Sequence, residues 1–266
     1  MKYKMIATDL DGTLLNDNRE ISRENMLTIN KAINKGVLVV PCTGRAIQGI
    51  TRYKELKALK MPAVAYNGGM IINLENMSVI FHCPLPHSDA EFIINKGNEL
   101  NTNICVWIDN KLYCNKINRY TLEYSTISGV QPIKFKSFND IKNKTVTKIL
   151  WYDSEEKISL FLNNMTKCVS ENVSCCTSKP WFLEFFNSQT SKGLALRKLG
   201  EIYNIASSEI LAIGDELNDI SMINYAGTGV AMFNGKDQLK SVADYTTNSN
   251  NNKNGFTEAV NKFILL

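Results

Sequence analysis

The chain has 266 residues, of which 44% are hydrophobic and 21% are charged, and its formal net charge is +4. This composition excludes collagen-like, coiled-coil and wholly disordered proteins, and the length predicts one large domain or two modest ones. The small net charge gives no support to nucleic-acid or anionic-membrane binding, and no apolar run approaches the ~20 residues that span a bilayer. We therefore expect neither nucleic acid nor a membrane as a partner.

The cysteine and histidine content limits the chemistry further. The seven cysteines show no Cys-x-x-Cys spacing, which indicates reduced structural thiols, and we interpret Cys42 as a small buried hydrophobe. Two histidines leave little material for a histidine-rich zinc site or a Ser-His-Asp hydrolase. The apolar stretch near the start is too short for a signal peptide, so we expect a cytoplasmic protein whose chemistry uses carboxylates.

The first third of the chain alternates strand and helix. Apolar runs predict strands at residues 3–8, 37–40 and 63–66. Ser22 is the expected N-cap of a helix that stops at Gly36, and a second helix is expected from residue 43 to about residue 59. This rhythm predicts a parallel sheet with right-handed crossovers.

The last third of the chain has the same rhythm. It predicts strands at residues 209–213 and 229–232, and helices at residues 192–203, about 238–243 and 256–264. Polar motifs follow several of the predicted strands in both thirds. Because open parallel sheets bind ligands at the carboxyl ends of their strands, these motifs are expected to lie close together.

The middle of the chain differs from both flanks. Hairpins are predicted at residues 102–114 and 173–185, together with a strand at 146–152 and a helix after Ser154. The predicted fold is therefore α/β, with a Rossmann-like parallel-sheet core (residues 1–82 and 189–266) and an inserted α+β domain (residues 83–188). We interpret the three tryptophans of the insert as core residues and not as substrate stackers, with the third as the best candidate for an exposed one; they are Trp107, Trp151 and Trp181.

The first motif, Asp9-Leu-Asp-Gly-Thr, follows the first predicted strand. Carboxylates at positions i and i+2 of an extended chain point to the same side, as Asp9 and Asp11 would. They repel each other unless a cation or a shared proton relieves the repulsion. The alternative interpretation is a polar turn with no chemistry.

Two further motifs suit an anion. Thr43-Gly-Arg follows the second strand and offers a hydroxyl and backbone N–H groups, although Thr43 could serve only as a helix N-cap. In Ser191-Lys-Gly, Lys192 opens a helix where its charge opposes the positive end of the helix dipole. A bound anion would offset both the lysine charge and the positive end of the helix dipole. The alternative is an exposed lysine whose charge is screened by solvent and salt.

The fourth motif, Gly214-Asp-Glu-Leu-Asn-Asp, adds a second acidic set. Oxygen ligands without histidine or cysteine predict a hard cation, most simply Mg²⁺. Asp219 is also expected to cap the helix that follows, and Glu216 is expected to face solvent. The four motifs together make an inventory for phosphoryl transfer, and neither a P-loop nor a Gly-x-Gly-x-x-Gly dinucleotide loop is present.

With these four motifs in this order, the sequence resembles the haloacid dehalogenase superfamily of phosphatases. More narrowly, it is similar to the Cof-type members with a type-IIB cap. The loop Asn67-Gly68-Gly69 is similar to the Asn-Gly-Ala loop of that family, with glycine in place of alanine. The resemblance covers essentially the whole chain and implies that residues 83–188 are the cap, because the first two motifs are too close together to hold one.

The resemblance implies a role for each motif residue. Asp9 would be the nucleophile that forms an aspartyl-phosphate, and Asp11 would act as acid and base, kept protonated by burial under the cap. Asn218 would position Lys192 or the phosphate. The expected catalytic residues are Asp9, Asp11, Thr43 and Lys192; the phosphate-binding residues are Leu10, Thr43, Gly44, Lys192 and Asn218; the metal ligands are Asp9, Asp11 (by its carbonyl), Asp215 and, as a supporting residue, Asp219; and the substrate loop contains Arg45, Asn67 and Gly68.

We therefore expect a Mg²⁺-dependent phosphatase, monomeric or weakly dimeric, that acts on small phosphorylated metabolites. Sugar phosphates, nucleotides and phosphorylated cofactors all fit this class. One alternative is a phosphomutase or phosphotransferase, in which the same aspartyl-phosphate passes to a second hydroxyl. The other is a non-catalytic metabolite-binding regulator, against which the four intact motifs argue.

Overall fold

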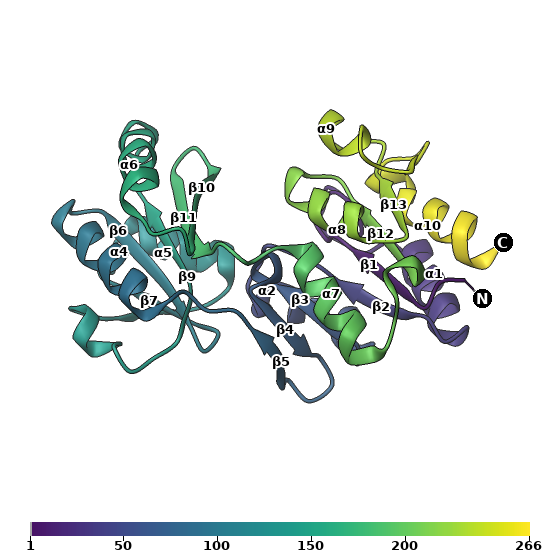
Figure 1. Ribbon diagram of the computed structural model, residues 1–266, viewed down its shortest axis with the longest axis horizontal. Coiled ribbons are helices and arrows are strands. Elements are labelled where there is room, and N and C mark those ends of the chain that lie inside the picture. The colour runs from purple at the N-terminus through teal and green to yellow at the C-terminus, as the bar shows by residue number, and fades with distance from the viewer. Residues whose placement is uncertain (1) are drawn as a thin grey trace. The chain divides into compact units, whose positions relative to one another are not determined.

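The computed structural model describes residues 2–266, which form two compact units (Figure 1). Unit 1 contains the described residues up to Gly44 together with Ile50–Phe81 and Ser191–Leu266. Unit 2 contains Arg45–Gly49 and His82–Thr190. None of the helices in residues 2–266 is long and apolar enough to cross a membrane.

Unit 1 is built from strands and helices of both ends of the chain. Its strands, with β5 running to its border, are β1 (Met5–Thr8), β2 (Leu38–Pro41), β3 (Pro62–Ala65), β4 (Met70–Asn73), β5 (Val79–His82), β12 (Ile210–Gly214), β13 (Thr228–Ala231) and β14 (Tyr245–Thr246). Its helices, with α2 spanning the border, are α1 (Arg23–Asn34), α2 (Ile47–Thr51), α3 (Lys54–Ala58), α7 (Lys192–Tyr203), α8 (Ile220–Tyr225), α9 (Asp237–Lys240) and α10 (Gly255–Val260).

Five parallel strands form the main sheet of unit 1, in the order β14-β13-β12-β1-β2. Strand β1 pairs with the central strand β12, which lies far away in the sequence but alongside it in space (Figure 1). The register places Thr8 opposite Ile213 on one side and opposite Pro41 on the other. The residues that follow these three strands therefore meet at one edge of the sheet.

Two helices of unit 1 begin and end as the sequence predicts. Ser22 caps α1 by accepting a hydrogen bond from the backbone N–H of Asn25 at 3.1 Å, and Gly36 follows the helix with φ +82°. Ser191 caps α7 in the same way through Leu194 N–H at 3.1 Å. That cap fixes Lys192 as the first residue of the helix.

Several predicted elements differ from the structure. The single helix expected over residues 43–59 is wrong: α2 and α3 are separate because Tyr53 between them has extended backbone (φ −87°, ψ 104°), and Gly49 weakens α2. The third predicted strand, β3, turns back antiparallel into the unpredicted β4, while its Val64 bridges to Cys42 in parallel. The expected helix at 238–243 is the shorter α9, and the expected helix at 256–264 becomes a π-helical turn after α10.

Unit 2 is an α+β unit with one six-stranded sheet, in the order β10-β11-β9-β6-β7-β8. Its strands are β6 (Asn103–Ile108), β7 (Lys111–Cys114), β8 (Pro132–Lys134), β9 (Val146–Tyr152), β10 (Val173–Lys179) and β11 (Phe182–Asn187), and its helices are α4 (His87–Glu99), α5 (Arg119–Ser128) and α6 (Glu155–Cys168). Both predicted hairpins are present, and Asp109 and Asn110 turn the first with left-handed φ angles of 48° and 59°. The core interpretation of the tryptophans is confirmed for two of them, since Trp107 and Trp151 are buried, whereas Trp181 is 39% exposed.

Candidate active site

The four sequence motifs supply the loops at the carboxyl edge of the parallel sheet of unit 1. Asp9 follows β1, and its N–H donates to the carbonyl of Ile213 at 2.9 Å, so it enters the loop beside β12. Asp215 follows β12 directly, and Thr43 follows β2 after Cys42. The parallel register therefore brings together residues that lie more than half the chain apart.

Lys192 is the central cation of this edge. Its ammonium donates to Asp9 Oδ1 at 2.5 Å and also to Asp219 Oδ1. The Lys192 and Asp219 side chains are fully buried, and Asp9 is 6% exposed. The alternative interpretation of Lys192 as an exposed, screened lysine is therefore wrong, because its charge is compensated by carboxylates from two other loops.

Burial and mutual charge shift the ionisation of this cluster. Burial raises the pKa of Asp9 well above its usual range, against the opposing effect of Lys192. Burial alone would lower the pKa of Lys192, but Asp9 and Asp219 outweigh it and raise that pKa. Burial also raises the pKa of Asp215 to about 7, with Asp219 adding to the effect and a hydrogen bond from Thr13 opposing it.

Asp215 is held by the first motif as well as by its own loop. Thr13 Oγ1 donates to Asp215 Oδ1 at 2.7 Å, and both residues are buried. Gly12 has φ +79°, and a Cβ placed there would lie 2.2 Å from Asp215 Oδ2. Thr13 was not among the predicted site residues, although it belongs to the first motif.

Asp219 does not cap α8, and that expectation is wrong. Its Oδ2 accepts hydrogen bonds from the backbone N–H groups of Asp215 and Glu216, at 2.9 and 3.0 Å. The carboxylate therefore turns back into its own loop, where Gly214 leaves room: a Cβ there would lie 2.6 Å from Asp219. The side chain of Glu216 is 53% exposed, which confirms that it faces solvent.

A second group of motif residues at this sheet edge is linked by hydrogen bonds; it contains Thr43, Asn67 and Asn218. Thr43 is buried, its N–H donates to Val64 O at 2.9 Å, and its carbonyl accepts from the N–H of Asn67 at 3.0 Å. Asn218 Nδ2 donates to Asn67 Oδ1 at 2.9 Å. Because α2 begins only at Ile47, Thr43 is not the N-cap of that helix, so the helix-cap interpretation is wrong.

The remaining predicted residues lie as follows. Leu10 is fully buried, whereas Asp11 is exposed, so unit 1 alone does not supply the burial expected for this carboxyl group. Arg45 belongs to unit 2, where its guanidinium donates to the carbonyl of Gly49 at 3.2 Å. Cys42 is a fully buried thiol, as expected for a small hydrophobe.

Three carboxylates of the cluster meet the geometric requirements of a cation site. One oxygen from each of Asp9, Asp215 and Asp219 lies within 4.8 Å of the others. With Lys192 as the partner ammonium, three ionised carboxylates would leave an excess negative charge in a buried place, and a cation would offset it. The donor set contains only oxygen, which suits a hard divalent ion.

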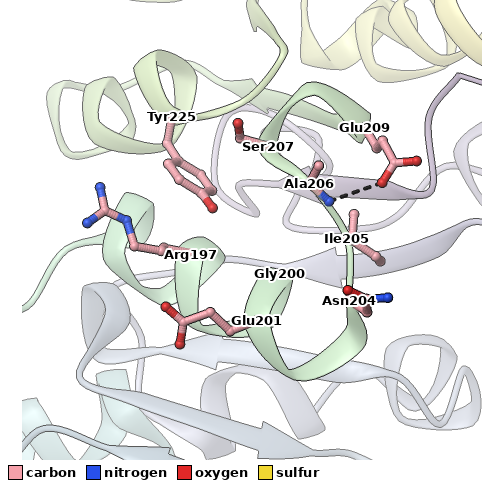
Figure 2. Close-up of a pocket in the computed structure, with 9 residues that line it drawn as sticks. All are labelled: Arg197, Gly200, Glu201, Asn204, Ile205, Ala206, Ser207, Glu209 and Tyr225. Carbon is pink, nitrogen blue, oxygen red and sulfur yellow. Dashed lines mark hydrogen bonds between the residues drawn. The ribbon is translucent and has the colours of Figure 1, made fainter.

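A separate pocket lies at the opposite end of α7 from Lys192 (Figure 2). It has a volume of about 410 Å³ and is lined by Arg197, Glu201 and Tyr225 among others, with Ala206 N–H donating to Glu209 Oε2 at 3.0 Å. None of the motif residues lines it. The pocket is therefore not part of the site at the sheet edge.

Comparison with known proteins agrees with this arrangement. Residues 6–260 match the family model of haloacid dehalogenase-like hydrolases. The Bacillus subtilis protein YxeH is 34% identical over 269 residues, which cover 99% of both chains. The B. subtilis protein YcsE, named as a 5-amino-6-(5-phospho-D-ribitylamino)uracil phosphatase, is 30% identical over 262 residues, with 98% of this chain and 96% of that protein covered.

A solved structure shares the complete fold. TM0651 from Thermotoga maritima superposes with a TM-score of 0.91 and 31% identity, covering 98% of this chain and 97% of that one. The chain belongs to the haloacid dehalogenase-like hydrolases. Within them it is a phosphatase, the class to which its relatives are assigned by name.

Proposed function

We propose that this enzyme is a Mg²⁺-dependent phosphatase of small phosphorylated metabolites that works through an aspartyl-phosphate on Asp9. One observation carries the proposal: the buried Lys192 ammonium bridges Asp9 and Asp219, with the Asp215 carboxylate beside them. A carboxylate is a weak nucleophile towards an anionic phosphate, so a phosphatase needs cations where the two anions meet.

The proposed metal ligands are the Asp9 and Asp215 carboxylates and the Asp11 backbone carbonyl. Asp9 and Asp215 each accept a hydrogen bond at one carboxylate oxygen, from Lys192 and from Thr13, and the second oxygen of each would bind the metal. Asp219 uses both of its oxygens, which favours a supporting role. Bound Mg²⁺ would supply electrophilic charge that neutralises phosphate oxygens.

The proposed reaction has two steps. In the first, an Asp9 carboxylate oxygen bonds to phosphorus while the ester oxygen leaves and takes a proton from Asp11. In the second, Asp11 removes a proton from water, the water oxygen bonds to phosphorus, and the bond between phosphorus and Asp9 breaks. Lys192, the Thr43 hydroxyl and the loop N–H groups of Leu10 and Gly44 would hold the phosphoryl oxygens.

Residues 83–188 are the proposed cap, and residues 1–82 with 189–266 the catalytic core. The α+β architecture of unit 2 and its own hydrophobic core support an independent, substrate-selecting domain. A cap would exclude water and shield Asp11, which unit 1 leaves exposed. The name of the relative YcsE supports a substrate of metabolite size.

Hydrolysis of a chromogenic aryl phosphate tests the proposal. The wild-type protein, the protein with EDTA and the Asp9→Asn variant are assayed side by side. We expect turnover that needs Mg²⁺ and disappears in Asp9→Asn. Turnover that survives in Asp9→Asn would mean that another residue is the nucleophile. Transfer of the phosphoryl group to an added alcohol instead of water would indicate a phosphotransferase.

A further inference from the structure

The short turn at Tyr66–Gly68, between β3 and β4, contacts three of the four motif loops. The backbone N–H of Asn67 donates to Thr43 O at 3.0 Å in the second motif. Its side-chain oxygen accepts from Asn218 Nδ2 at 2.9 Å in the fourth motif. A Cβ on Gly44 would lie 2.9 Å from the same Asn67 oxygen, so the second motif packs closely on this side chain.

The third motif rests on the next residue of the turn. Gly68 has φ +103°, and a Cβ placed there would lie 2.2 Å from the carbonyl oxygen of Ser191. Ser191 is the N-cap of α7 and directly precedes Lys192. The position of the Lys192 backbone therefore depends on close contact with Gly68.

One residue of the turn, Tyr66, holds a backbone conformation that its residue type does not favour. Tyr66 and Asn67 have φ angles of 53° and 55°, and a bulky residue such as Tyr66 rarely adopts this left-handed region. Such conformations persist where the surroundings fix them, and they cluster at functional sites. Here the surroundings are the motif loops themselves.

We propose that Asn67 is a positioning residue for the phosphoryl group. Its side-chain oxygen holds Asn218 next to the second motif, and its backbone N–H holds Thr43. Asn67 thereby keeps Thr43 and Asn218 at a fixed distance from each other on the two sides of the phosphoryl group. This inference rests on the proposed phosphatase mechanism and gives Asn67 a role beyond that of a substrate-loop residue. Misplacement of such groups by about 1 Å can lower a rate by roughly 100-fold.

The test uses two matched glycine variants. Asn67→Gly removes the amide but keeps the left-handed backbone, which glycine adopts freely. Asn204→Gly is the control, since Asn204 has φ 53° and ends the same α7 helix far from Lys192. Both variants, wild type and Asp9→Asn are assayed with an aryl phosphate and Mg²⁺, and their thermal midpoints are compared.

We expect Asn67→Gly to lower kcat and kcat/KM together by about 10- to 100-fold, with KM within about 3-fold of wild type. Asn204→Gly should keep wild-type kcat, and both variants should keep similar thermal midpoints. In an Asn218→Ala background the Asn67→Gly change should cost much less, because the two side chains act as one unit.

Three results would overturn the inference. An Asn67→Gly variant with wild-type kcat, a loss confined to KM, or the full loss in the Asn218→Ala background would each exclude positioning through Asn218. A wild-type protein without turnover, or an active Asp9→Asn variant, would instead refute the underlying mechanism.

Discussion

The Lys192 ammonium and the Asp9 carboxylate, 183 positions apart in the chain, form a buried ion pair with 2.5 Å between Nζ and Oδ1. The lysine opens α7, and the aspartate follows β1, so two separate elements must be in place for the pair to form. The same ion pair therefore stabilises unit 1 and belongs to the candidate active site.

Replacing Lys192 with methionine should destabilise the protein and remove its activity. Loss of the ammonium leaves Asp9 and Asp219 buried without a counter-charge, a change that costs about 3–5 kcal/mol. Urea unfolding measures this cost. Lys198→Met is the control, since the Lys198–Glu201 pair on the same helix is exposed and should contribute less than about 1 kcal/mol. Equal urea midpoints for Lys192→Met and Lys198→Met would refute the assignment of Lys192 as the buried counter-charge of Asp9 and Asp219.

Asp215 should give metal-free protein a distinctive pH dependence. Its folded pKa of about 7 exceeds the ordinary value near 4, so the folded state holds the proton more tightly. Stability should therefore be lost as the pH rises between these two values. With EDTA, the thermal midpoint should fall from about pH 5.5 to about pH 7.5, where normal carboxyl groups no longer titrate.

Two controls separate Asp215 from other groups. Asp215→Asn should show a smaller fall, with the remainder due to Asp9, whose pKa is also raised. Saturating Mg²⁺ should oppose the fall, because the metal binds the deprotonated carboxylates and so favours high pH. A midpoint that rises with pH in EDTA would contradict a raised pKa for the buried Asp215 carboxyl group.

Gly12→Ala and Gly36→Ala separate backbone strain from damage to the site. Both glycines have φ near +80°, so backbone strain alone should cost each variant about 1 kcal/mol or slightly more in unfolding free energy. A Cβ at position 36 meets nothing within 4 Å, whereas one at position 12 meets Asp215 Oδ2 at 2.2 Å. Calorimetric titration should show that Gly12→Ala binds Mg²⁺ at least about tenfold more weakly than wild type, whereas Gly36→Ala binds it as wild type does. Equal affinities in the two variants would exclude Asp215 as a ligand.

Unit 2 contains a second buried ion pair, between Lys148 Nζ and Glu184 Oε2 at 2.7 Å. Lys148→Met leaves Glu184 buried without its partner and should cost about 3–5 kcal/mol. Adding Glu184→Leu should restore most of that loss, because an apolar pair carries no desolvation penalty. The comparison is made by urea unfolding. A double variant as unstable as the single one would mean that the pair has another structural role.

The motif residues of the site could be chosen from the sequence because each has an unusual local context. A lysine at a helix start and an Asp-x-Asp pair after a strand both conflict with ordinary stability, which points to a ligand. The register of β1, β2 and β12 then brings these residues together. The alternating pattern predicted that these strands run parallel, but it did not predict their order in the sheet.

Contacts between loops could not be predicted in this way. The hydrogen bond between Asn67 and Asn218 joins residues 151 positions apart, and no local pattern states which loops will touch. Asp219 turns back towards Asp215 because Gly214 leaves space there, although its position before α8 is typical of a cap. The β4 strand was missed because its residues follow a tight turn with two left-handed residues, which periodicity does not reveal.

The fate of the phosphoryl group on the protein tests the aspartyl-phosphate mechanism most directly. Asp11→Asn, in which removal of the proton from water should be slow, is mixed with a ³²P-labelled aryl phosphate and Mg²⁺, quenched in acid and digested. An aryl oxide needs little protonation to leave, so the first step should still proceed in this variant. We expect a labelled acyl phosphate on the peptide that contains Asp9, and no label in the Asp9→Asn variant. Label on another residue, or wild-type turnover with no labelled protein at any time, would contradict it.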